Sequence, residues 1–304
     1  MRIILSVMLH PALVILIGLA TSIPASAQNR DERVYVPQSA FFVGLGGSAQ
    51  SINFGNQDVI AIGTSETTQN GVTIATGFAQ GPDDASGGTP IFMDSQLVFS
   101  PSVEVGYFQH FHKSNWLWGT KFTNDYIGAS SNFRNPVFPQ VGTYTPTGQD
   151  PVPFTGNAVA EATRTQVIDQ MALRPFIGYE IDNGFIYVGG GPTATKLQSD
   201  IRALVGFADI NGNRSDISGA PQDFSDSGWV AGGSTEVGIT HFFKDGWFID
   251  CSYGIGITAN RTFDFASTFS STNADGVTNA GTLVGDSTWQ GISQSFGIKF
   301  CKAF

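Results

Sequence analysis

Charged side chains are scarce in this sequence of 304 residues. Asp, Glu, Lys and Arg make up 13% of it, against about 25% in ordinary soluble domains. A soluble β-sandwich of this size would need many more Lys and Glu side chains to cover its outer faces. The formal net charge of −10 and the lack of Lys and Arg clusters also exclude a nucleic-acid partner, because neutralising phosphates requires such clusters.

Cysteine is almost as rare, with only Cys251 and Cys301 in the chain. An exported protein could join them in a disulfide. Cys251, however, shares a strand face with Tyr253, whereas Cys301 shares the opposite, polar face with Lys299. Side chains on opposite faces of one wall cannot bridge, so we expect two free thiols.

Long hydrophobic runs are confined to the N-terminus. Arg2 precedes an apolar run over residues 3–20, and the small residues Ala25 and Ala27 follow it. This pattern predicts a secretory signal peptide over residues 1–27, cleaved before Gln28. The alternative, a membrane anchor, is disfavoured by Pro11 and by the short run. Any later membrane span would have to be a closed β-barrel, in which inter-strand bonds satisfy every backbone group.

Alternation of apolar and polar residues, by contrast, recurs eight times after residue 39. A period of two residues predicts half-buried β-strands. We expect strands near residues 40–50, 101–111, 115–126, 166–181, 184–196, 228–243, 247–260 and 289–304.

The connections between these strands alternate between short and long. Short turns are predicted at residues 112–114, 183–184 and 244–246, two of which carry a glycine for a positive φ. The long, polar connections cover residues 51–95, 130–164, 198–226 and 262–288. A transmembrane barrel produces this pattern when one end faces the periplasm and the other faces outward. An even strand number then puts both termini on the periplasmic side.

The final strand ends on an aromatic residue. Its apolar face carries Phe296, Ile298, Phe300 and Phe304. This ending resembles the C-terminal assembly signal of Gram-negative outer-membrane barrels. The whole pattern resembles small barrels such as the OmpA transmembrane domain, the opacity proteins and the alphaproteobacterial surface-antigen barrels.

The resemblance implies an eight-stranded antiparallel up-and-down transmembrane β-barrel over residues 39–304, with long extracellular loops. A short periplasmic segment over residues 28–38 would precede it. The implied location is the outer membrane of a Gram-negative bacterium. The implied partners are outer-membrane lipid and lipopolysaccharide, periplasmic chaperones and the barrel assembly machinery.

Charged residues on the polar faces are expected to point into the lumen. They are Glu104, Lys121, Asp125, Arg174, Glu180, Glu236, Asp250 and Lys299. Because an eight-stranded barrel is only wide enough for side chains, we interpret them as a paired plug, with interspersed glycines leaving room. The alternative is a narrow acidic ion path, which requires a loose plug or a ten-stranded barrel. Residues 58–63 and 71–78 would supply the two extra strands.

Turn geometry sets the expected register. Strands paired symmetrically about the first short turn place Glu104 directly opposite Lys121, so we expect a cross-strand ion pair. The third turn needs three residues, with Gly246 left-handed, for Glu236 and Asp250 to share a face.

Large aromatic residues gather near the strand ends. Tyr107, Trp116, Trp118, Tyr179, Trp247 and Tyr253 lie near the short turns, and Trp229 and Trp289 near the long connections. They are similar to the aromatic girdles of membrane barrels. The alternative is a lipocalin-like soluble barrel with the rings inside, which the scarcity of surface charge disfavours.

Catalytic signals are weak. His110, His112 and His241 fall near short turns, where we interpret them as polar turn residues, and no Ser, His and acidic residue converge from the predicted strands. We expect no cofactor or metal. Long connections usually carry function, so we expect a non-catalytic surface protein with a structural or adhesive role. The alternatives are a small-solute porin and, third, a lipid-modifying barrel enzyme.

Overall fold

The computed structural model describes residues 35–81, 89–90, 94–210, 212–217 and 219–304. The expected signal peptide, and most of the segment expected over residues 28–38, lie outside this range. The described part is built almost entirely of β-strands, with one short 3-10 helix, η1 (Lys244–Gly246). None of its helices is long and apolar enough to cross a membrane.

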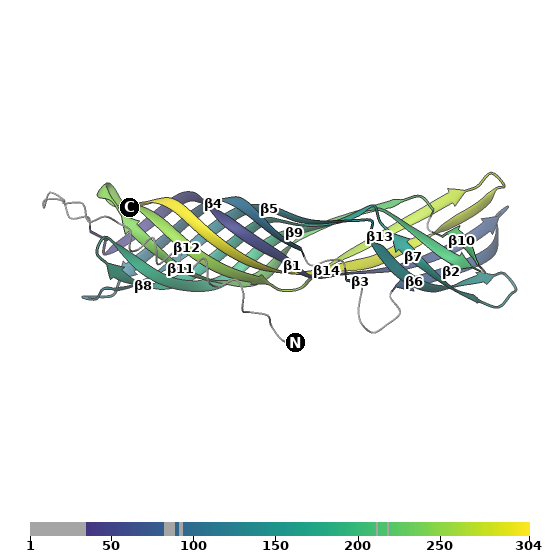
Figure 1. Cartoon of the computed structure of the whole chain (residues 1–304), viewed down its shortest axis with the longest axis horizontal. Helices are drawn as coiled ribbons and strands as arrows, with labels where there is room; N and C mark the ends of the chain where they lie inside the picture. The colour runs from purple at the N-terminus through teal and green to yellow at the C-terminus, as the bar shows by residue number, and fades with distance from the viewer. Residues whose placement is uncertain (1–34, 82–88, 91–93, 211, 218) are drawn as a thin grey trace.

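Eight strands close into an antiparallel ring, which we call the proximal barrel (Figure 1). In ring order they are β1 (Ser39–Gln69), β4 (Asp94–His110), β5 (Trp116–Arg134), β8 (Ala162–Ile181), β9 (Gly184–Ile210), β11 (Gln222–Phe242), β12 (Trp247–Thr258) and β14 (Val277–Ala303). Pairing of β1 with β14 closes the ring. The eight-stranded antiparallel barrel expected from the sequence is confirmed.

Most of the chain expected as long loops is also strand, and that expectation was wrong. β1, β9 and β14 run on past the ring into a second region, which we call the distal section (Figure 1). It adds β2 (Val72–Gly81), β3 (Thr89–Pro90), β6 (Val137–Pro146), β7 (Val152–Val159), β10 (Asn213–Asp216) and β13 (Arg261–Thr272). The Thr, Val and Phe residues that alternate with small residues in these segments favour extended backbone.

The ten-stranded alternative is not what forms. Residues 58–63 belong to the outer half of β1, and residues 71–78 belong almost entirely to β2. β1 and β2 pair with each other from Ala61↔Gly81 to Gln69↔Val72, beyond the ring. They therefore lengthen the molecule without adding a strand to the proximal barrel.

The distal sheet is curved, and its margins meet without backbone pairing. Its strands follow the order β13, β14, β1, β2, β6, β7 and β9, and β9 also pairs with β11. In the described part of the chain, β11 and β13 are joined by side chains. The rings of Phe224 and Phe265 lie 4.7 Å apart, and the Ser267 hydroxyl donates to the Gln222 side-chain oxygen at 2.6 Å.

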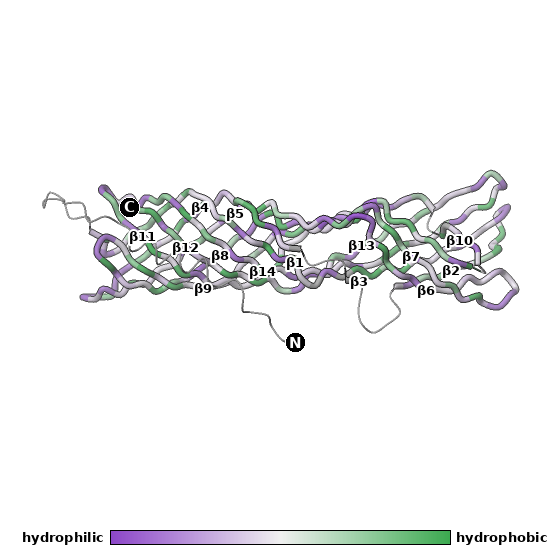
Figure 2. The backbone as a smooth tube through the Cα atoms, in the orientation of Figure 1, coloured by the Kyte–Doolittle hydropathy of each residue, from purple (hydrophilic) through white to green (hydrophobic). Residues whose placement is uncertain are grey.

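Alternation decides which side chains face outward. Figure 2 shows hydrophobic and hydrophilic positions alternating along the strands of both sections. On β1, Phe41, Val43 and Leu45 are exposed on the outer surface, whereas Phe42 is buried inside. Phe300 and Ile298 are likewise exposed, and Cys301 is buried with its thiol free, as is that of Cys251.

One aromatic residue was assigned to the wrong face. Trp289 is only 2% exposed and packs inside against Phe54, with ring centroids 5.8 Å apart. It has the same parity along β14 as Gly291 and Ser293, which face inward, and the opposite parity to the exposed Ile292. Its indole therefore fills the barrel rather than the membrane interface.

The first short turn is one residue longer on each side than expected. β4 ends at His110 and β5 begins at Trp116, with Lys113 at φ 55°. Glu104 is therefore opposite Thr123, and the predicted register was wrong by two residues. A two-residue slip preserves the faces of both strands, so the side chains of Glu104 and Lys121 still meet.

The third turn forms as predicted. Its three residues make η1, with Gly246 left-handed at φ 71° and Asp245 at φ 62°. Glu236 and Asp250 are consequently both buried on the inner face.

Gly119 offers a test of this packing. A Cβ there would overlap the ring of Phe176 and the Tyr107 carbonyl oxygen. We expect Gly119→Ala to lower the free energy of unfolding by about 1–3 kcal/mol, the usual cost of overpacking. Gly233→Ala is the matched control, because its Cβ would meet only the Gly191 carbonyl oxygen at 3.9 Å. Denaturant unfolding in lipid vesicles measures both, and equal stability of the two variants would contradict the packing.

Candidate functional site

Most of the predicted lumen charges converge at one level of the proximal barrel. Three carboxylates and three cations meet there, each from a different strand. They are Glu104 (β4), Lys121 (β5), Arg174 (β8), Glu236 (β11), Asp250 (β12) and Lys299 (β14). We call these six residues the charge cluster. Their formal charges cancel, and all six are buried.

Lys121 is the centre of the charge cluster. Its Nζ lies 3.2 Å from Asp250 Oδ2 and 3.5 Å from Glu104 Oε2, and it also pairs with Glu236 Oε1. One ammonium therefore joins carboxylates from three other strands. Its three N–H donors suit such a convergence.

The other two cations complete the pairing. Lys299 Nζ donates to Glu104 Oε2 at 2.9 Å. Arg174 Nη1 donates to Glu236 Oε2 at 3.1 Å, and Arg174 Nε donates to the Ser234 hydroxyl at 2.9 Å. Buried charges are tolerated only when they are paired and hydrogen-bonded in this way.

Tyr187 is part of the same network, and sequence reasoning missed it. Its hydroxyl accepts from Lys121 Nζ at 2.7 Å and lies 2.8 Å from Asp250 Oδ1 and 2.9 Å from Glu236 Oε1. Its parity on β9, opposite that of the outward Ile186 and Val188, placed it on the polar face. A tyrosine with inward parity, in a barrel whose other inward positions carry charges, could have predicted that its hydroxyl joins them.

The remaining predicted lumen residues lie outside the charge cluster. Asp125 is buried elsewhere on β5 and forms no ion pair among the described residues. Glu180 lies near the short turns, where its Oε2 is 3.1 Å from Nε2 of the buried His110. His110 was interpreted as a polar turn residue, and that interpretation was wrong. It is the last residue of β4 and is buried, because its parity along the strand points inward, whereas His112 and His241 are exposed. No group of three or more His, Cys, Asp or Glu side chains in the described part is placed to hold a metal ion.

An aromatic layer fills the lumen between the charge cluster and the short turns. We call it the phenylalanine plug; its large members are Phe42, Phe108, Leu117, Phe176, Phe185, Phe242 and Phe248. The centroid of the Phe108 ring, for example, lies 5.3 Å from that of Phe185 and 6.1 Å from that of Phe242. Gly106 and Gly119 make room for two of these rings, because a Cβ there would overlap Phe42 and Phe176 respectively.

A second apolar layer lies at the other end of the proximal barrel. It contains Ile52, Phe54, Ile127, Val167, Leu197, Val230, Phe263 and Trp289. The charges between the two apolar layers are shielded from solvent, since Glu104 is 1% exposed and Lys121 is 3% exposed. A water-filled channel would leave its lining exposed, so this lumen is closed.

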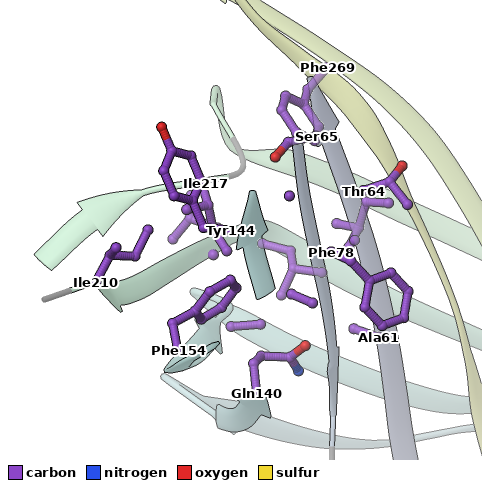
Figure 3. A pocket seen from close by; sticks show the side chains of 18 residues that line it. Ala61, Thr64, Ser65, Phe78, Gln140, Tyr144, Phe154, Ile210, Ile217 and Phe269 are labelled. Carbon is purple, nitrogen blue, oxygen red and sulfur yellow. The ribbon is translucent and has the colours of Figure 1, made fainter. Parts of the chain in front are cut away.

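The distal section, by contrast, contains a hollow, which we call the distal pocket (Figure 3). Phe154, Phe269, Leu204 and Leu283 form apolar walls, together with Ile210 and Ile217. Ser65 and Gln140 are labelled on opposite sides of the space, and Tyr144 lies to the left in this view (Figure 3). None of its lining residues is charged.

A polar cleft of about 430 Å³ opens beside it, between β11 and β13. Its rim carries Asp223, Asp226 and Asp264. Asp264 is directly opposite Asp286 on β14. Partial burial, and then the negative charge of Asp264, raise the pKa of the Asp286 carboxyl above its ordinary value. The outer surface of the distal section is therefore acidic at this point.

Comparisons with known proteins found distant structural likenesses alone. No protein-family model and no curated protein matches the chain. Among solved structures it is similar to the attachment invasion locus protein Ail of Yersinia pestis, at 12% identity over 81% of this chain and 98% of that one, with a TM-score of 0.23. It is also similar to the outer membrane protein OprG of Pseudomonas aeruginosa, at 9% identity over 90% and 99%, with a TM-score of 0.30. The outer membrane protease OmpT of Escherichia coli matches at 8% identity over 90% and 99%, with a TM-score of 0.29.

These proteins are small outer-membrane β-barrels, the group that the sequence resembles. Their TM-scores and identities are too low to support any argument about this chain's activity. The fold rests on the closed ring of strands itself.

Removing the central cation tests the charge cluster. Lys121→Met leaves three buried carboxylates without their shared partner, and we expect it to lower the free energy of unfolding by about 3–5 kcal/mol. Glu180→Gln, at the more exposed pair near the short turns, should cost about 1 kcal/mol or less. Both are measured by denaturant unfolding in lipid vesicles. A Lys121→Met protein as stable as Glu180→Gln would show that the cluster does not form.

Proposed function

We propose that this chain is an outer-membrane surface protein of a Gram-negative bacterium with a binding or adhesive role and no catalytic activity. The proximal barrel anchors it in the membrane, and the distal section projects outward and contacts the external partner. The observation that carries this proposal is the contrast between a lumen closed by three layers of side chains and a distal section that contains a pocket and an acidic cleft.

The outer surface of the proximal barrel supports the membrane assignment. Near the short turns it exposes Trp116, Trp118, Tyr179, Trp247 and Phe300. Toward the distal section it exposes Tyr126 and Trp229, the latter by 47%. Two bands of rings around an apolar surface suit the two membrane interfaces. Lipid and lipopolysaccharide would surround this wall.

The C-terminal strand supports assembly by the barrel machinery. Ile298 and Phe300 lie exposed on one face of β14. Phe304 follows the end of the strand with its ring exposed, and its amide donates to the Phe41 carbonyl oxygen at 2.8 Å. The strand that would be recognised is thus the one that closes the ring. Both ends of the barrel chain meet at the short turns, which the proposal assigns to the periplasm.

The porin alternative requires an open lumen. A solute would have to pass the phenylalanine plug, the charge cluster and the second apolar layer in turn. We therefore favour a silent barrel. Reaction chemistry has even less support, because the histidine that turns inward, His110, is paired with Glu180 near the periplasmic end, away from the distal pocket.

Single-channel recording distinguishes a closed barrel from a porin with an open lumen. The refolded protein in a planar bilayer should show no conductance steps, because no water path crosses the buried charge cluster. Correct insertion is verified on the same sample by protease protection. Reproducible steps that change in amplitude in Glu104→Ala would overturn the proposal in favour of an acidic porin.

Cysteine labelling on intact cells tests the orientation. Gln149→Cys, in the turn between β6 and β7 of the distal section, should react with a membrane-impermeant maleimide. His112→Cys, in a short turn, should react only after the outer membrane is permeabilised. The wild-type protein corrects for Cys251 and Cys301. Labelling of His112→Cys in preference to Gln149→Cys on intact cells would reverse the topology.

A further inference from the structure

The distal pocket exists because small residues face it from neighbouring strands. Ala61 and Gly63 on β1, Gly77 and Ala79 on β2, and Ala158 on β7 line it. In the proximal barrel, Gly106 and Gly119 sit against the rings of Phe42 and Phe176, which occupy the space that these glycines leave. A Cβ at Gly63, in contrast, would have only Leu283 Cδ1 within reach, at 4.0 Å. The space beside Gly63 is therefore free.

The chemistry of the lining restricts what can enter. The walls are largely apolar, and an apolar pocket accepts apolar groups. No lining residue carries a charge, so a carboxylate or ammonium would lose its hydration without gaining a partner. Gln140 and Ser65, on opposite sides, can each donate and accept a hydrogen bond. An uncharged polar end would therefore be accommodated.

The size of the pocket restricts the shape. It offers about 50 Å³, whereas an engineered cavity that binds benzene measures about 150 Å³. This volume encloses only part of a molecule of that size, so a six-membered ring would not fit inside whole. The end of an unbranched alkyl chain is narrower than a ring and needs less volume, so it suits this space.

We propose that the distal pocket binds the end of an unbranched alkyl chain that carries an uncharged polar group. This inference rests on the proposal that the distal section holds the binding role. It assigns that role to a lipid-like ligand with a neutral head. The acidic rim of the polar cleft, with Asp223, Asp226 and Asp264, disfavours anionic ligands further.

Alanine methyl NMR provides a direct test with the whole protein in lipid nanodiscs. 1-Hexanol is the probe, with cyclohexanol and hexanoate as comparisons. Saturable shifts are expected at the methyl groups of Ala61, Ala79 and Ala158, and none at Ala172, which is buried in the proximal barrel. Cyclohexanol and hexanoate should bind more weakly by about tenfold or more. Shifts that do not saturate, or that are as large at Ala172, would sink the assignment, as would equal binding of the three probes.

A matched pair of variants locates the binding. Gly63→Leu places a side chain in the free space and should weaken 1-hexanol binding by about tenfold or more. Val284→Leu enlarges an exposed side chain on the outer face of β14 by one methylene and should bind as the wild type does. Should Gly63→Leu not fold, Ala158→Leu fills the pocket from β7. Unchanged binding in a folded pocket-filling variant would refute the site. Because this experiment does not read conductance or topology, a silent and correctly oriented barrel without hexanol shifts would remove only the pocket assignment.

Discussion

The ammonium of Lys121 holds together the middle of the proximal barrel. Its three carboxylate partners come from β4, β11 and β12, and Tyr187 of β9 joins them through its hydroxyl. Strands on opposite walls are thus tied across the lumen as well as along the backbone ladders. The six residues of the charge cluster therefore find their partners at one level, where all six are buried. Because the six charges pair with one another, they need no polar partners from the two apolar layers on either side.

Much of this arrangement follows from parity alone. Because side chains alternate across a strand, the inward set Glu104, Lys121, Arg174, Glu236, Asp250 and Lys299 could be written down from the sequence. The register could not, since the first turn runs from Phe111 to Asn115 and shifts the pairing by two residues. The ion pair survived this error because lysine is long enough to reach a carboxylate two positions away. Trp289 shows the opposite case. It was assigned to the membrane interface because it is aromatic, although its parity along β14 predicts an inward side chain.

The distal section was hidden by composition. Segments rich in Thr, Ser and Gly look like loops when polarity is the criterion, yet Thr is well suited to strands. Their inward positions hold Ala61, Ala75, Ala79 and Ala158, which give almost no apolar contrast with the polar outer face. The same small residues that concealed the strands from sequence analysis also created the distal pocket. The phenylalanine plug was missed for a different reason. Its rings share their strand faces with charged residues, so these faces were classed as polar.

The continuous pairing of β1 with β14 gives the molecule a mechanical axis. The ladder runs from Phe42↔Ala303 in the proximal barrel to Gln69↔Val277 near the distal tip, with one irregularity between Gly55 and Asp58. Antiparallel ladder bonds lie perpendicular to their strands. A pull on the tip along the long axis therefore loads many of these bonds together in shear, rather than one at a time by peeling. The margin between β11 and β13 has no backbone pairing among the described residues and carries no such load. Tension from an attached surface would therefore pass to the membrane through β1, β14 and β9, the strands that run from the ring into the distal section.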